Sequence, residues 1–371
     1  MTSRERILTA LRRGTPDRVP ISTYELVGYN SKAFENNDPS YTRLMDTIRE
    51  KTDCLCMWDP TSNATFLQFS RPVEMQVQET REDDAIVRRK TLHTPQGALT
   101  QTIKIVHNVH TIWQTEHWCK NLADVERALS IPYEPLEYDF SDYARIAAEV
   151  GDNGVIMSSV ADPLWLAADL MSFGDYTVWA RTETGHFIRA LDIMHERAMD
   201  NLPRMLDARV VDVYRICGPE YATPPYLPRE LFQRFVVPYV AEMVDLIHDR
   251  GAFARFHCHG RIGQVLDMIM DTGSDAVDPC EAPPDGDVTL DEVKKRCGSS
   301  MCIFGNIQLR LLECGSPDDI EQAVINCMAG AKAGGGYVIM PTAAPISSPL
   351  QPKTEDNYVR FIDVALKHGK Y

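Results

Sequence analysis

The pattern of hydrophobic and polar residues differs between two parts of the chain. Between residues 71 and 119, the runs "VEMQVQET", "AIVRRKTLHT" and "ALTQTIKIVH" alternate with period two and are rich in Val, Ile and Thr. The segments "REDD" and "PQG" separate them as turns. Period-two alternation is typical of strands with one buried face. This stretch is therefore predicted to form antiparallel strands outside the main scaffold.

From residue 139 onward, amphipathic helices alternate with short apolar strands. The strands lack a polar face, which predicts parallel strands covered by helices on both sides. Adding residues 19–23 and 54–58, which precede the antiparallel stretch, gives about eight such strands. That number favours an α/β fold with one closed (β/α)8 barrel, a TIM barrel, over an open sheet. We expect residues 1–371 to form this single domain, with helices over 164–208 and 230–249 among its outer layer.

The composition excludes several classes of partner. The 371-residue chain has a net charge of −15, so it repels nucleic acid and anionic membranes. No apolar run approaches the roughly 18 residues that span a bilayer. The opening "MTSRERILTALRRG" predicts an amphipathic helix, not a signal peptide. The ten cysteines are scattered and read as reduced thiols. A cytoplasmic location is therefore expected.

Polar side chains follow many of the predicted strands. In a (β/α)8 barrel the carboxyl ends of the strands form one mouth, which carries the active site. We therefore expect ionisable and polar groups from distant parts of the chain to meet there. The candidates are Tyr24, Glu25, Asp59, Glu220, Tyr221, His257, His259, Cys280, Glu281, Asn306, Gln308 and Thr342.

The stretch "RFHCHGRIG", residues 255–263, suggests a metal site. On a strand, His257 and His259 share one face, while Cys258 points to the other. Zinc accepts His, Cys and carboxylate ligands, and the third ligand could be Glu281, Cys280 or Glu220. The alternative is that both imidazoles hydrogen-bond to neighbouring carboxylates in a dry polar network. Asp162 and Asp278, each before a proline, are interpreted as turn residues.

Several segments resemble the uroporphyrinogen decarboxylase superfamily. They are "RERILTALRRGTPDRVPI", "YLPRELFQRFVVPY", the H-x-H-G stretch, "CIFGNI" and "GGGYVIMPTAAP", in the order of the family. The resemblance covers nearly the whole chain and implies a (β/α)8 barrel. The superfamily contains true decarboxylases and also methyltransferases that serve corrinoid proteins.

The departures from the family pattern favour the methyltransferase branch. True decarboxylases grip the substrate with an arginine-rich loop, but the matching segment "STYELVGYN" has no arginine. The family's late histidine is also absent from "TAAPISSP". The methyltransferases hold zinc with H-x-C-G and a later cysteine. Here His259 replaces the first cysteine, and the later one is missing near Thr342. A site richer in nitrogen and oxygen ligands makes zinc a harder Lewis acid, which suits a methyl ether.

The resemblance implies a methyltransferase of the O-demethylase type. It would move a methyl group from a small methylated substrate, an aryl methyl ether first, to a Co(I) corrinoid (cobalamin) on a partner protein. Zinc on His257, His259 and Cys280 would act as the Lewis acid. Glu220 and Glu281 are the expected catalytic acids, and the expected substrate-binding residues are Tyr24, Glu25, Tyr221, Asn306 and Thr342. A lyase acting on a smaller carboxylate is the alternative, and the chain could also form a homodimer.

Overall fold

A seven-stranded parallel sheet lies at the centre of the computed structural model, which describes residues 1–371. Its strand order is β1-β8-β9-β10-β11-β12-β13. The α/β class and the curled parallel sheet of a TIM-like barrel are confirmed, but the sheet has seven strands where the predicted closed (β/α)8 barrel has eight. The strands span Cys54–Met57 (β1), Gly154–Ala161 (β8), Val213–Cys217 (β9), Phe253–Cys258 (β10), Ala276–Pro279 (β11), Cys302–Ile307 (β12) and Tyr337–Pro341 (β13).

The expected first strand, residues 19–23, is not a strand of this sheet. Only Ile21 forms a β-bridge, to Ile339 of β13. The reason is local, because Pro20 has no N–H and Ile21 donates its N–H to the carboxylate of Asp53 at 2.8 Å. The segment nevertheless lies between β13 and β1. The carbonyl of Pro20 accepts from Ile339, and that of Ile21 accepts from Asp53.

Helices cover the outside of the curled sheet. They span Ser3–Leu11 (α1), Thr42–Lys51 (α2), Leu122–Leu129 (α3), Tyr143–Val150 (α4), Pro163–Ala168 (α5), Phe173–Thr182 (α6), Thr184–Leu206 (α7), Arg229–Phe235 (α8), Val237–Asp249 (α9), Leu266–Asp271 (α10), Leu290–Cys297 (α11), Leu309–Cys314 (α12), Pro317–Ala331 (α13) and Pro352–His368 (α14). Short 3-10 helices occupy Phe34–Asn36, Pro39–Tyr41, Gly151–Asn153, Pro219–Ala222 and Ile262–Gln264.

Two of the expected helices are divided. The stretch 164–208 forms α5, α6 and α7, because Ser172 caps a new helix start at α6 and Glu183 leaves the helical conformation between α6 and α7, with φ −121° and ψ 39°. The stretch 230–249 forms α8 and α9, since Pro238 in the first turn of α9 has no N–H to continue the preceding helix. None of these helices combines the length and the apolar character that crossing a membrane requires.

The parallel strands separate two hydrophobic cores. Side chains such as Leu55, Met157 and Phe304 form the inner cluster, into which α1 inserts Ile7 and Leu11. The alternate positions of the same strands join a much larger cluster with the outer helices. Successive residues of a strand point to opposite faces, so position along a strand decides which core a side chain joins.

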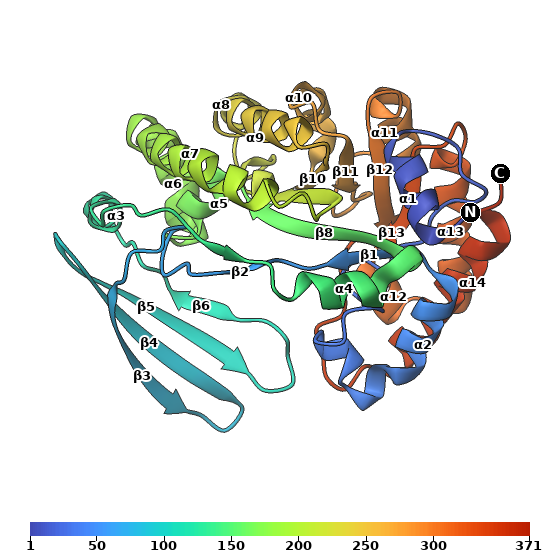
Figure 1. The fold of residues 1–371 in the computed structure, drawn as a ribbon, viewed down its shortest axis with the longest axis horizontal. Coiled ribbons are helices and arrows are strands. Elements are labelled where there is room, and N and C mark those ends of the chain that lie inside the picture. Colours follow the sequence, from blue (N-terminus) through green and yellow to red (C-terminus); the bar gives the residue numbers. More distant parts are fainter.

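A four-stranded antiparallel sheet lies beside the parallel sheet. Its order is β3-β4-β5-β6, with β3 at Glu74–Arg81, β4 at Ala85–Thr94, β5 at Gly97–Val106 and β6 at Trp113–Glu116. All four strands fall within the stretch whose alternation predicts antiparallel strands. In Figure 1 this sheet (teal) lies at the lower left, far from the two chain ends. A short pair, β2 (Thr61–Ser62) with β7 (Tyr138–Asp139), completes the strands.

Candidate active site at the carboxyl ends of the parallel strands

Two arginines lie side by side on the inner face of the parallel sheet. Arg215 of β9 is in register with Arg255 of β10, and both are almost fully buried. Buried guanidinium groups need carboxylate or other acceptor partners. Arg255 donates from Nε to Oδ1 of Asp278 at 2.8 Å, and its Nη2 lies 2.7 Å from Oδ2. The guanidinium of Arg255 also lies over the ring of Phe304.

Asp278 is the central anion of this cluster. Its place before Pro279 predicts a turn residue, and that prediction is wrong. It is fully buried on β11, in register with His257 of β10, and its Oδ2 lies 2.9 Å from Nδ1 of His257. Burial raises the pKa of Asp278, but Arg255 and His257 together lower it by more than burial raises it. The pKa is therefore well below its ordinary value. Asp278 therefore stays ionised and fixes both neighbours.

His257 is a neutral imidazole held at both nitrogens. Burial, the largest effect, lowers its pKa to about 3. Because Nδ1 faces the ionised Asp278, we assign the proton to Nδ1. The lone pair of Nε2 then accepts a hydrogen bond from Nη2 of Arg215, 2.9 Å away. Both nitrogens of His257 are therefore engaged by protein groups.

His259 lies next to His257 and forms an ion pair. The two rings are perpendicular, with centroids 4.7 Å apart. Nδ1 of His259 lies 3.1 Å from Oε1 of Glu281, whose Oε2 accepts from the backbone N–H of Gly260 at 2.7 Å. Burial lowers the pKa of His259, but Glu281 outweighs it, and the net pKa is raised. That of Glu281 is lowered, because His259 outweighs the effect of burial.

Glu220 differs from Glu281 in the direction in which its pKa is shifted. It lies in the 3-10 helix after β9 and accepts a hydrogen bond from the N–H of Gly218 at 3.0 Å. Burial raises its pKa, although the charges of His259 and Arg215 oppose this. The site thus holds one carboxyl group whose pKa is raised and one, paired with an imidazole, whose pKa is lowered.

The residues present do not fit the expected three-ligand zinc site. No group of three or more His, Cys, Asp or Glu side chains is placed to hold a metal ion. Cys280 belongs to the outer core with Cys258, and its thiol faces the carbonyl of Val277. It follows the end of β11 and has a left-handed φ of 57°, so strand alternation no longer sets its direction. The Nε2 lone pair of His257, which a metal would need, faces Arg215.

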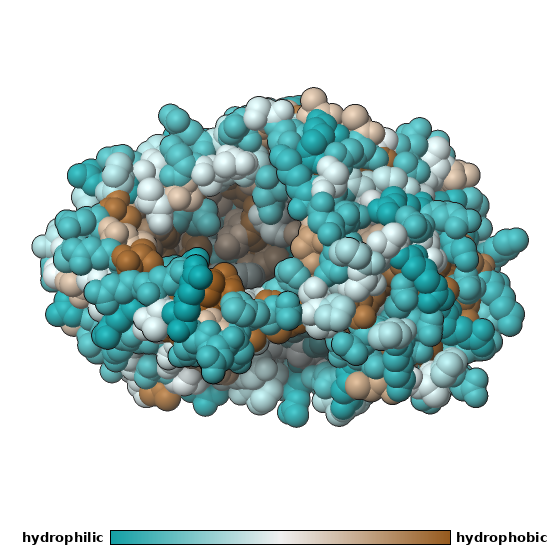
Figure 2. All heavy atoms as spheres, turned by 90° about the horizontal axis from the view of Figure 1, so that it is seen from below, coloured by the Kyte–Doolittle hydropathy of each residue, from teal (hydrophilic) through white to brown (hydrophobic).

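A cavity of about 570 Å³ opens beside this cluster. It touches three strands through Met57 at the end of β1, Ser159 of β8 and Arg215 of β9. Figure 2 shows a hollow with hydrophobic walls on one face of the molecule. Concave sites with apolar walls and a few polar groups bind small molecules. The remaining residues around the cavity are Glu25, Phe66, Leu67, Gln68, Trp118, Val160, Ala161, Trp165, Leu166, Asp169, Leu170 and Cys217.

Two of the five expected substrate-binding residues lie at Arg215. Glu25 borders the cavity and accepts from Nη1 of Arg215 at 2.8 Å, and the hydroxyl of Tyr24 accepts from Nη2 at 2.5 Å. The other three are engaged elsewhere. Tyr221 packs within an aromatic cluster, Asn306 donates to the carbonyl of Cys280, and Thr342 accepts the N–H of Leu309 at the start of α12.

Sequence reasoning missed Arg215, Arg255 and the aromatic walls of the cavity. The sequence did contain a signal for the arginines, because each is the only Asp, Glu, Lys or Arg residue within a mostly apolar strand, "VYRIC" or "FARFHC". A buried arginine requires a carboxylate, and Asp278 stands on the neighbouring strand. Trp118 and Trp165 carried no such signal, since they come from segments without a strong pattern.

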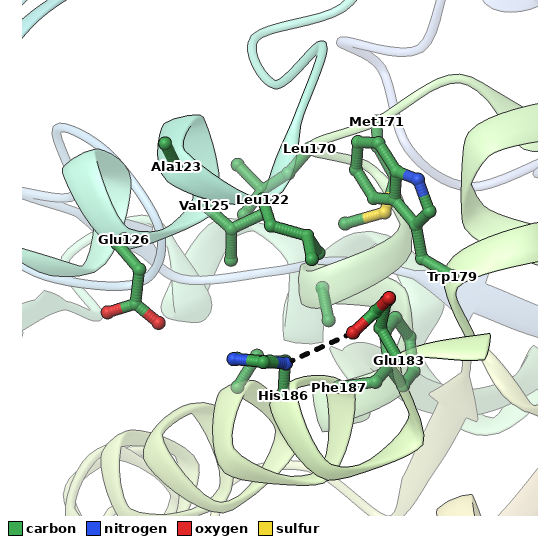
Figure 3. A pocket seen from close by; sticks show the side chains of 12 residues that line it. Leu122, Ala123, Val125, Glu126, Leu170, Met171, Trp179, Glu183, His186 and Phe187 are labelled. Carbon is green, nitrogen blue, oxygen red and sulfur yellow. Dashed lines mark ion pairs between the residues drawn. The ribbon is translucent and has the colours of Figure 1, made fainter. Parts of the chain in front are cut away.

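A second cavity, of about 270 Å³, lies between α3, α5, α6 and α7 (Figure 3). Nine of its twelve residues are hydrophobic, including Trp179 and Phe187. The side chains of Glu183 and His186 lie 3.4 Å apart at one side of it. Leu170 borders both cavities, but no residue at the end of a parallel strand borders this one. It holds none of the clustered ionisable groups and is not the candidate site.

Comparison with known proteins shows the family of this chain. The family model described as uroporphyrinogen decarboxylase (URO-D) matches residues 72–354. The chain therefore belongs to the uroporphyrinogen decarboxylase family, as its sequence landmarks predict. The matched range includes all of the clustered residues on β9, β10 and β11.

Two curated relatives are described as methylcobamide:CoM methyltransferase MtaA. One is from Methanosarcina barkeri (strain Fusaro / DSM 804) and one from Methanosarcina barkeri. Each is 26% identical over 162 residues, which is 44% of this chain and 45% of the relative. The match thus spans less than half the length of these relatives.

A solved structure described as a methyltransferase from Methanosarcina mazei has the same fold. It aligns over 99% of both chains with a TM-score of 0.63 and 17% identity. At this identity the likeness supports the architecture of the curled parallel sheet and its helices.

Proposed function

We propose that this protein moves a methyl group from a small methylated molecule, an aryl methyl ether first, to the Co(I) corrinoid of a partner protein. The observation that carries the proposal is the cavity at the strand ends, with its aromatic walls and adjacent ionisable cluster. The family membership and the likeness to methylcobamide:CoM methyltransferases support the reaction class. The corrinoid would supply the nucleophile that accepts the methyl group.

The residues of this chain would bind the donor and assist its leaving oxygen. Trp118 and Trp165 would contact an aromatic ring from the walls of the cavity. The breaking C–O bond leaves its electron pair on oxygen, which then needs a proton. Glu220 is our candidate for the proton donor, because its pKa is raised. Glu281, with its lowered pKa, would instead hold His259 in its charged form.

Zinc remains a prediction of the sequence. The resemblance and the relatives favour a metal, whereas the expected set of His257, His259 and Cys280 does not fit one. We therefore derive no step through a metal ion. The positive charge that borders the cavity is the guanidinium of Arg215, which contacts Nε2 of His257.

The test combines the purified protein with reduced free cobalamin and a panel of methyl donors. The panel contains methoxybenzenes, methoxybenzoates, methanol and methylamines. We expect the absorbance of methylated cobalamin to appear with an aryl methyl ether, and the demethylated phenol to accumulate in equal amount.

The lyase alternative is favoured by one feature, the arginine at the cavity, which suits a carboxylate substrate. Release of carbon dioxide from a carboxylic acid, with no methylation of cobalamin by any donor, would replace the methyltransferase proposal with the lyase.

A further inference from the structure

A pocket with four arginines lies at the amino ends of the parallel strands, at the opposite end from the candidate active site. It has a volume of about 200 Å³ and lies where the chain enters β9 and β10, next to α1. Its charged residues are Arg4, Arg12, Arg209, Arg250 and a single acid, Asp212. The whole chain has 53 acidic and 38 basic residues. The pocket therefore reverses the charge balance of the chain, which favours an anionic ligand.

Asp212 neutralises only one of the four arginines. Its Oδ2 accepts from Nη1 of Arg4 at 2.7 Å and its Oδ1 accepts from Nη2 at 2.5 Å, which is the strong two-pronged arrangement. Oδ2 also accepts from the backbone N–H of Ile156 at 3.3 Å. Nε of Arg250 contacts the exposed Asp207 at 3.2 Å, which leaves its Nη groups without a protein acceptor. Asp212 is therefore not available to the other arginines of the pocket.

Arg12 and Arg209 have no carboxylate partner at all. Both side chains are exposed, and neither guanidinium forms an ion pair or a hydrogen bond with the protein. The guanidinium of Arg12 lies over the ring of Phe253, 5.5 Å from its centroid, and Phe253 also lines the pocket. This contact with the ring holds the cation in place without using its N–H donors. An anion in the pocket can therefore accept from all of them.

Arg209 has a backbone conformation that favours glycine. Its φ is 50°, in the left-handed region, and its N–H donates to the carbonyl of Leu206 at the end of α7 at 2.9 Å. A side chain with a Cβ atom carries a conformational cost there. Such local strain persists where other interactions offset it, and it is concentrated at functional sites. An anion bound by the guanidinium of Arg209 would supply that offset.

The size and the donors of the pocket define the class of ligand. Sites that enclose drug-sized molecules begin at roughly 300 Å³, so this pocket suits a smaller ligand. The planar fork of N–H groups on arginine matches the oxygens of a phosphate, and a phosphate dianion can neutralise more than one unpaired cation.

We propose that this pocket binds the phosphate group of a small molecule, through Arg12, Arg209 and Arg250. The site lies at the other end of the strands from the cavity proposed for the methyl donor. Its occupation by phosphate can therefore be tested without any methyl transfer, and the proposed function does not depend on the result.

Isothermal titration calorimetry of the full chain, at constant ionic strength and in a buffer without phosphate, measures this binding. The probes are inorganic phosphate, glycerol 3-phosphate and acetate. We expect a single saturable site with a dissociation constant of about 1 mM or lower for the phosphates, and weaker binding of acetate. Either ranking of the two phosphates supports the proposal, and the tighter one distinguishes an organic ester from the free ion. Absence of saturable phosphate binding, or equal affinity for acetate, would overturn the proposal.

A double variant, Arg12→Gln with Arg209→Gln, tests whether the arginines of the pocket hold the phosphate. We expect the affinity for phosphate to fall about 10-fold or more, because hydrogen bonds from charged groups are lost. The matched control is Arg81→Gln with Arg89→Gln, which removes two exposed arginines from β3 and β4. Its affinity for phosphate should be unchanged. Equal losses in the two double variants would show a general attraction to the surface and contradict the proposal.

Arg209→Gly separates binding from folding. Glycine adopts a left-handed φ without strain, so the variant should keep or raise the temperature of thermal unfolding. We expect it to weaken phosphate binding about 3-fold or more, since one charged donor group is removed. Phosphate affinity that is unchanged in the folded Arg209→Gly protein would contradict the role assigned to Arg209.

Discussion

The carboxylate of Asp278 lies 2.9 Å from Nδ1 of His257, where β11 and β10 are in register. The same carboxylate also receives the guanidinium of Arg255. One buried anion thus orients an imidazole at the candidate active site and neutralises a cation inside the curled sheet.

Asp278→Asn should strongly destabilise the protein, because it leaves Arg255 buried without a negative charge. We expect the free energy of unfolding to fall by about 3–5 kcal/mol, measured by urea denaturation. The control is Asp142→Asn, a partly exposed residue that pairs with Lys32 and Arg145 at the surface. Its effect should be about 1 kcal/mol or less. Equal effects of the two substitutions would contradict the role assigned to Asp278.

Filling the cavity at the strand ends should prevent substrate binding. Ala161→Phe places a ring in this cavity from the end of β8. We expect methylation of cobalamin to fall at least about 100-fold, since the donor is displaced from its position. Ala123→Phe places the same ring at the second cavity and is the matched control. Full activity of Ala161→Phe would show that the methyl donor binds elsewhere.

Metal analysis of the purified protein tests the zinc prediction. The sequence predicts about one zinc per chain on His257 and His259. Cys280→Ala should leave the zinc content unchanged, because this thiol lies in the outer core. His259→Ala should lower it. Loss of zinc from Cys280→Ala would show that the thiol turns inward when metal binds. A fully active protein without zinc would make the prediction wrong.

Glu116 of β6 should make the stability depend on pH in the acid range. Its pKa is lowered to about 2, mainly by the hydrogen bond from Thr102, with further contributions from Lys120 and Thr100. In the unfolded chain the carboxyl group has its ordinary pKa, about 4.3. The stabilisation is therefore complete above the unfolded pKa and is lost as the pH falls towards 2.

Thr102→Val should raise the pKa of Glu116, which nuclear magnetic resonance titration of its carboxyl carbon would measure. It should also weaken the loss of stability between pH 4 and 2. Thr115→Val is the matched control, because the hydroxyl of Thr115 donates to the carbonyl of Thr102 and not to Glu116. An unchanged pKa in Thr102→Val would contradict this account.

Much of the architecture follows from the sequence by itself, because hydrophobic periodicity is a local property. The apolar runs at 154–161 and 213–217 form parallel strands, and the alternating runs between 71 and 119 contain β3 to β6. The shared face of His257 and His259, opposite Cys258, also follows from strand geometry alone. The segments that resemble the uroporphyrinogen decarboxylase family can also be recognised from the sequence alone.

The partners of the site residues were decided by the tertiary structure. Arg215 reaches Glu25 across 190 positions of the chain, and no local pattern specifies that contact. The strand register joins His257 to Asp278, and His259 contacts Glu281, so each imidazole lies beside a carboxylate. The side chain of Cys280 lies in the outer core and not beside the histidines, because its backbone adopts a left-handed φ after the end of β11. Strand alternation fixes the face of a side chain, but only packing between strands and loops fixes which group it meets.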